Sequence, residues 1–161
     1  MKFAIFNLTL SFPDYILQLG CASLFGLMLG YERALHRKVA SFTTFSLLSL
    51  GSCILTHLSV EMSEAFNSLM SNAIADPMRI PSYILASIGF ASAGVIFKDH
   101  DSAYIEGVTT AVMMWLAASI GMCCGFGRLD LAFWGVVLYF IILRVARISH
   151  NVVDKFDLIQ E

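Results

Sequence analysis

Five long apolar segments, separated by short polar ones, form the dominant pattern along the chain. They cover residues 15–31, 42–60, 81–97, 108–126 and 129–148. Within each segment the apolar residues are continuous rather than alternating, which favours helices over the strands of a membrane barrel. Because about 20 apolar residues cross the hydrocarbon core of a bilayer, the pattern predicts an all-α bundle of five transmembrane helices.

The composition excludes the main alternatives to a membrane protein. Of the 161 residues, 58% are hydrophobic and 14% are charged, and the mean hydropathy is +0.76. A soluble domain of this size leaves too much of its surface exposed to hide so many apolar residues, and a disordered chain has the opposite composition. A net charge of −2 gives no reason to expect a nucleic-acid partner. The lipid bilayer is therefore the expected partner.

The basic residues predict the orientation, because they concentrate on the cytoplasmic side of inner-membrane proteins. With five spans, one side collects Arg33, Arg37, Lys38, Lys98, Arg144, Arg147 and Lys155, and the other holds Lys2, Arg79 and Arg128. This excess places the N-terminus outside and the C-terminus in the cytoplasm. We expect a transmembrane domain over residues 1–148 and a short cytoplasmic tail over residues 149–161.

Two further stretches have amphipathic patterns. Between the second and third spans, apolar residues recur at helical spacing among serines, an asparagine and a glutamate, which predicts a separate helix lying flat on the outer interface. A weaker apolar stripe occurs in the tail. The residues concerned are Met62, Phe66, Leu69, Met70 and Ala73 in the first stretch, and Val152, Phe156 and Ile159 in the second.

The four cysteines do not have the spacing of a disulfide framework or a zinc site. Cys21 and Cys53 fall within apolar spans, and Cys123 and Cys124 are adjacent. They are interpreted as small apolar residues. No bound metal and no cofactor are predicted.

Small residues at intervals of four predict close contacts between helices, because lipid removes the hydrophobic driving force and backbones must approach closely. These contacts either hold the five helices of one chain together or form the face of a homo-oligomer. The predicted packing residues are Ala22, Gly26 and Gly30 in the first span, Gly89, Ala93 and Gly94 in the third, and Gly121 and Gly125 in the fourth.

Four ordered motifs resemble the MgtC/SapB family of bacterial inner-membrane proteins. They are GLMLGYER at residues 26–33 followed by Lys38-Val-Ala40, DPMR at 76–79, IGFASAGVIF at 88–97, and GVTTA at 107–111 followed by Trp115. The resemblance covers about residues 15–145. It departs from the family pattern at Thr43, where an arginine is expected, and at Tyr83, where a glutamine is expected. The soluble C-terminal domain of many members is also missing after Glu161.

The resemblance implies a multi-pass protein of the bacterial inner membrane, linked to magnesium homeostasis and to adaptation or virulence. Members of the family are thought to modulate other membrane machinery, such as a membrane ATPase or a transporter. An activity of the missing soluble domain cannot be transferred to this chain. A magnesium-transport ATPase is not expected either, because the sequence has no phosphate-binding GxxxxGK[ST] loop.

Charged and hydroxylated residues near the lipid are the candidate functional residues, because such groups are costly there. Glu32 and Arg33 end the first span, where they either anchor the helix or act in function. Asp76 is expected to cap the third helix with Pro77 at its first position. Arg79 opposes that helix dipole and should therefore meet a carboxylate, most readily Asp76. The remaining candidates are Thr109 and Thr110 in the fourth span, and His57, interpreted as an interfacial residue with a proton relay as the alternative.

The family resemblance and the candidate residues leave two possible functions. The first is a non-enzymatic membrane protein that regulates a membrane ATPase or transporter through helix–helix contacts. The alternative is a cation (Mg²⁺) transporter or channel that uses polar groups such as Asp76, Arg79, Thr109 and Thr110. Acidic residues in mid-span, which transport pathways often contain, are absent from the sequence. An intramembrane enzyme is not predicted, because no nucleophile–base pair or HExxH motif is present.

Overall fold

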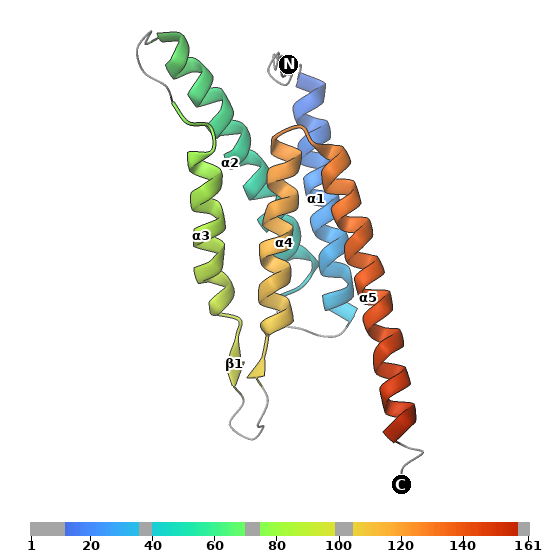
Figure 1. Cartoon of the computed structure of the whole chain (residues 1–161). Helices are drawn as coiled ribbons and strands as arrows, with labels where there is room; N and C mark the ends of the chain where they lie inside the picture. Colours follow the sequence, from blue (N-terminus) through green and yellow to red (C-terminus); the bar gives the residue numbers. More distant parts are fainter. Residues whose placement is uncertain (1–11, 36–39, 70–74, 99–104, 158–161) are drawn as a thin grey trace, which may run out of the picture.

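Five helices make up most of the part of the chain that the structure describes. The computed structural model describes residues 12–35, 40–69, 75–98 and 105–157. The helices are α1 (Phe12–Leu35), α2 (Phe42–Leu69), α3 (Arg79–Ala93), α4 (Val108–Gly125) and α5 (Leu129–Asp157). They lie side by side, and α5 ends at the opposite end of the bundle from the start of α1 (Figure 1). The predicted all-α class is confirmed.

Three of the described helices are long and apolar enough to cross a membrane. They are α2, α4 and the segment Leu129–Ile148 of α5. α3 has only 15 residues, and the uncharged part of α1 is confined between Asp14 and Glu32. Length and composition thus support a membrane crossing for three of the five predicted spans. The membrane crossings of α1 and α3 and the orientation of the bundle stay predictions.

Two helices continue beyond the apolar segments that predicted them. α2 continues to Leu69, so residues 62–69 extend a membrane helix instead of forming a separate interfacial one; Met70 and Ala73 lie outside the described residues. α5 likewise continues to Asp157, so the helix does not end where the apolar segment ends. A helix can project beyond the bilayer because its backbone hydrogen bonds stay within the helix on both sides of the interface.

The third predicted segment is divided between a helix and a strand. α3 ends at Ala93, and residues 97–98 form strand β1 (Phe97–Lys98), which pairs antiparallel with β2 (Ile105–Glu106). Gly107 follows β2 with φ +88°, and a Cβ there would lie 1.8 Å from the Val95 carbonyl oxygen. Only glycine fits this close turn, which directs the chain from the β-ribbon into α4.

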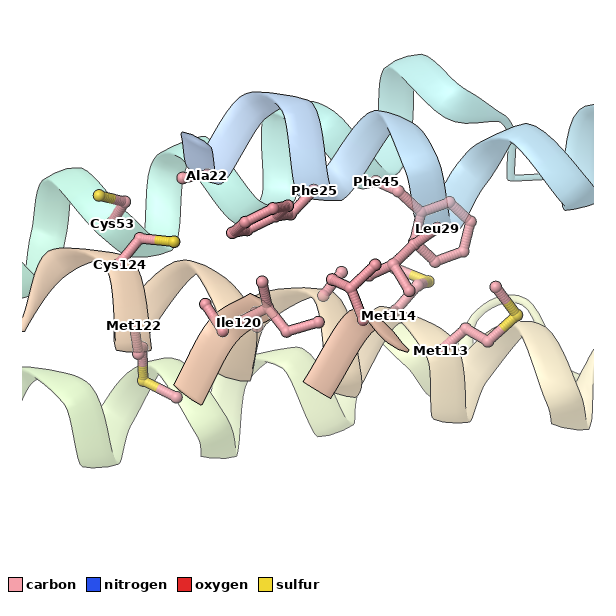
Figure 2. Packing of buried hydrophobic residues seen from close by; sticks show 14 of the residues in the cluster. Ala22, Phe25, Leu29, Phe45, Cys53, Met113, Met114, Ile120, Met122 and Cys124 are labelled. Carbon is pink, nitrogen blue, oxygen red and sulfur yellow. The ribbon is translucent and has the colours of Figure 1, made fainter. Parts of the chain in front are cut away.

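The core is formed where α1, α2 and α4 meet. Phe25 and Leu29 of α1 and Phe45 of α2 are buried together with the face of α4 that carries Met114 and Ile120. Figure 2 shows these side chains gathered in one layer between the helices, with Cys53 and Cys124 facing the same layer. The four cysteines are free thiols, and Cys53 and Cys124 are fully buried, in agreement with their interpretation as small apolar residues.

Glycines allow α2 to approach both of its main neighbours closely. A Cβ at Gly26 would lie 2.6 Å from the Phe45 carbonyl oxygen, and one at Gly30 would lie 2.4 Å from Phe42 Cα. On the other side, a Cβ at Gly121 would lie 2.1 Å from the Ser49 carbonyl oxygen, and one at Gly125 would lie 2.7 Å from that of Cys53. With the fully buried Ala22, these glycines place the small-residue stripes of α1 and α4 between helices of this chain.

The small residues of α3 behave differently from those of α1 and α4. Gly89 and Ala93 are exposed, and a Cβ at Gly89 would meet nothing within 4 Å. A Cβ at Gly94 would approach only the Ala91 carbonyl of its own turn, and neighbouring Phe90 is 86% exposed. These residues therefore do not pack against other helices of this chain, and the alternative of an oligomer face stays a prediction. Their spacing matches that of the packed stripes, but α3 turns its other face to the bundle.

Candidate functional site

The last turn of α1 carries the two charged residues that the sequence singled out. Glu32 and Arg33 are 7% and 9% exposed, and Arg33 Nε donates a hydrogen bond to Glu32 Oε2 at 2.6 Å. Gly30 brings this turn against the start of α2, which explains why such large polar side chains are covered. Charges so deeply buried require partners.

Arg147 of α5 supplies a second partner for Glu32. Its Nη2 atom donates to Glu32 Oε1 at 3.3 Å, and the Arg147 side chain is about half exposed. This ion pair joins residues 115 positions apart in the sequence. Sequence reasoning placed Arg147 among the cytoplasmic charges but did not identify it as a site residue. Its spacing of three from Arg144, on one face of α5, was the available signal.

A tyrosine links the same two helices further into the bundle. Tyr139 of α5 is buried, and its hydroxyl donates to the Leu29 carbonyl oxygen at 3.4 Å and lies 3.6 Å from Met113 Sδ. These contacts reach both α1 and α4. Tyr139 was also missed at the sequence level, because a tyrosine in an apolar segment is indistinguishable from an ordinary core or interface residue.

A cavity of about 290 Å³ opens beside the Glu32–Arg147 pair, between α1 and α5. Its charged lining residues are Glu32, Arg144 and Arg147, and Glu32 is also paired with the buried Arg33. This arrangement can bind an anionic group while its walls accept apolar atoms. The remaining lining residues are Tyr31, Leu35, Phe140 and Leu143.

Asp76 and Arg79 lie at the start of α3, at the other end of the bundle (Figure 1). Asp76 Oδ1 accepts a hydrogen bond from the Met78 backbone N–H at 2.9 Å, but the N-cap residue of α3 is Met78 rather than Asp76. Arg79 is exposed and forms no ion pair with any described residue, so the expected pairing with Asp76 was wrong. Water can satisfy an exposed guanidinium without a carboxylate.

Thr109 and Thr110 occupy the first turn of α4, at the same end of the bundle as Glu32 (Figure 1). Thr110 is 3% exposed, whereas Thr109 is exposed. They are therefore not equivalent: Thr110 belongs to the helix interface and Thr109 faces outward. At the opposite end, Arg128 binds Asp130 through two hydrogen bonds of 3.1 and 3.0 Å, and this pairing raises the pKa of Arg128.

A second polar cluster joins α1 to α2 far from Glu32. The Tyr15 hydroxyl donates to Glu61 Oε1, and the Tyr15 and His57 rings meet edge to face with centroids 5.1 Å apart. His57 is buried, and its Nε2 atom has no hydrogen-bond partner among the described residues. His57 thus packs against Tyr15 of α1, and both its predicted position at the membrane interface and the proton-relay alternative are untested. Among the described residues, no three His, Cys, Asp or Glu side chains are placed to hold a metal ion.

Apolar helices, close glycine contacts and charges at the ends of the apolar segments are typical of a helical membrane protein. The chain belongs to the MgtC family, whose model matches residues 19–152. It is 36% identical over 133 residues to Protein SapB of Bacillus subtilis and 32% identical over 140 residues to Protein MgtC of Salmonella typhimurium. An uncharacterized protein of Haemophilus influenzae is 32% identical over 155 residues.

These alignments cover 83%, 85% and 94% of this chain but only 56%, 55% and 63% of the respective relatives. The chain thus spans little more than half the length of the SapB and MgtC proteins it matches. No solved structure is similar enough to match the fold. The family is established, and the activity of the longer relatives enters only as a proposal.

Proposed function

We propose that this chain is a non-enzymatic, multi-pass protein of the bacterial inner membrane that regulates a membrane ATPase or transporter through helix–helix contacts. We place it in magnesium homeostasis and in adaptation or virulence, as its family resemblance implies. The proposed topology has five crossings within residues 1–148, with the N-terminus outside and residues 149–161 in the cytoplasm. Glu32, Arg33, Asp76, Arg79, Thr109 and Thr110 stay the proposed functional residues, to which Arg147 is added.

The uncovered face of α5 is the observation that carries this proposal. Only 17% of its apolar window is buried, compared with 61% for α4. Large exposed side chains follow one another at alternating intervals of three and four, the spacing of a helix seam that packs along a partner helix. They are Leu131, Trp134, Leu138, Ile141 and Val145.

Site-specific photocrosslinking in the native membrane tests the proposal. A photoreactive residue at Leu138 is compared with one at Val112 of α4, which is also exposed but lies outside the seam. We expect Leu138 to yield a product with a subunit of a membrane ATPase or transporter, and Val112 to yield none. Identical products from both positions, or products with lipid alone, would refute the proposed contact.

The glycines are unsuitable for testing a partner contact. Gly26 and Gly121 lie against the backbone of α2, so a leucine at either position would separate helices of this chain. Loss of a partner would then report loss of the fold. Exposed positions on α5 avoid this ambiguity.

Cation transport remains the second candidate because the buried face of α2 is unusually polar. Buried polar groups inside a membrane bundle are a common feature of ion pathways. The Ser49 hydroxyl and His57 Nε2 have no hydrogen-bond partner among the described residues. Mg²⁺ flux into liposomes containing the purified chain, reduced by His57→Gln, would favour transport over regulation. The buried polar residues of α2 are Ser49, Ser52, Thr56, His57, Ser59 and Ser63.

A further inference from the structure

A second, apolar cavity lies along the same two helices as the cavity beside Glu32 and shares two lining residues with it. The second cavity has a volume of about 320 Å³ and is lined by Leu27, Met28, Tyr31 and Phe140. Tyr31 and Phe140 also line the charged cavity. Leu27 and Met28 lie one turn before Tyr31. The groove between α1 and α5 is therefore charged beside the last turn of α1 and apolar towards the middle of the bundle.

We propose that this groove binds one anionic phospholipid, with its phosphate at Arg144 and Arg147 and an acyl chain against Leu27, Met28 and Phe140. The molecule would lie along the groove in the direction that it takes in a bilayer. The proposal does not depend on the proposed regulation of a partner, because the α5 seam through Leu138 lies on the opposite face of that helix.

The charges at the mouth of the groove favour an anionic headgroup over a zwitterionic one. Glu32 is already bound by Arg33 Nε at 2.6 Å and by Arg147 Nη2 at 3.3 Å. Arg144 is exposed and forms no ion pair with any described residue. Among the described residues at this end of the groove, one carboxylate is therefore accompanied by three guanidinium groups. Two of the three are on α5, where a phosphate can be reached from the membrane interface.

The aromatic residues join the two halves of the groove. Tyr31 is 62% exposed and lines both cavities together with Phe140. Tyrosine is favoured at the level of lipid headgroups because one end of its side chain is apolar and the other is polar. This position matches the glycerol region of a phospholipid, between the phosphate and the acyl chains.

Native mass spectrometry of the full chain, released from detergent micelles, tests the proposal. Phosphatidylglycerol and phosphatidylcholine with the same acyl chains are titrated separately into wild type, Arg144→Gln and a control, Arg79→Gln. Arg79 is an exposed arginine at the other end of the bundle. We expect one tightly bound phosphatidylglycerol on wild type and on Arg79→Gln, with affinity about fivefold lower in Arg144→Gln.

Two further measurements test whether the acyl chain, and not only the phosphate, is bound in the groove. Leu27→Trp fills the apolar half of the groove and should weaken phosphatidylglycerol binding while helicity, followed by circular dichroism, is retained. Glycerol phosphate is added as a competitor without acyl chains. Equal affinity for both lipids, an unchanged affinity in Arg144→Gln, or displacement of the lipid by equimolar glycerol phosphate would overturn the proposal.

Discussion

Replacing Gly121 by alanine should destabilise the protein more than any other single methyl addition on α4. The new Cβ would lie 2.1 Å from the Ser49 carbonyl oxygen, 2.8 Å from its carbon and 2.9 Å from its Cα. All three are backbone atoms of α2, so no side-chain rotation relieves the overlap. α2 and α4 must separate by about 1 Å, and the neighbouring side chains must repack.

The expected cost follows from comparison with a glycine that has free space around it. Inserting a methyl group into a packed interface costs about 1–3 kcal/mol. Alanine is also the better helix former, by about 1 kcal/mol in water, which offsets part of this cost. At Gly51 on α2 and Gly89 on α3, a new methyl group would have no other atom within 4 Å. Gly51→Ala and Gly89→Ala therefore report the propensity effect without the overlap.

Unfolding of the purified chain in mixed micelles, with increasing sodium dodecyl sulfate and far-UV circular dichroism, measures the difference. We expect Gly121→Ala to unfold at a clearly lower mole fraction of sodium dodecyl sulfate than wild type, by the equivalent of about 1–3 kcal/mol. Gly51→Ala and Gly89→Ala should unfold no earlier than wild type. A Gly121→Ala variant as stable as these two controls would refute the close approach of α2 and α4.

The same assay tests three further substitutions. Gly107→Ala should destabilise by at least about 1 kcal/mol because φ is +88° and Val95 blocks the new methyl group; stability equal to wild type would contradict that turn. Glu32→Ala should cost about 3–5 kcal/mol, since it leaves the guanidinium of buried Arg33 without its carboxylate. Arg147→Ala should cost less than about 1 kcal/mol because that side chain is about half exposed. Equal losses in Glu32→Ala and Arg147→Ala would contradict the proposed difference in burial.

The sequence was sufficient to predict the helices but not all of their ends. Continuous apolar segments identified all five described helices, because burial in lipid or in a helix core needs the same residues. The second apolar segment ends at residue 60, yet α2 continues to Leu69. Charged residues end the favourable contact with lipid without breaking the helix. The two-residue strands β1 and β2 were missed because segments so short carry no periodicity.

Only the part of the candidate site on α1 could be predicted from the sequence, because its partner on α5 is distant along the chain. Glu32 and Arg33 stood out locally, as charges at the end of an apolar segment. Their partner Arg147 lies 115 residues away, and one sequence contains no information on which helix ends meet. The same limit explains the small-residue stripes: Gly121 faces Ser49, whereas Gly89 faces outward. Spacing identifies a face that permits close packing but does not say which face another helix covers.

The GLMLGYER motif therefore combines two physical tasks within one helix. Gly26 and Gly30 bring α1 against α2, and this contact buries the turn that carries Glu32 and Arg33. The buried carboxylate then pairs with Arg147 of α5 at 3.3 Å, so glycines that face α2 also support a contact between α1 and α5. A substitution at Gly30 should accordingly alter the α1–α5 groove as well as stability, whereas one at Leu138 should alter neither. Substitutions on the packed face of α1 thus test the structure of the protein, and substitutions on the exposed face of α5 test binding to a partner.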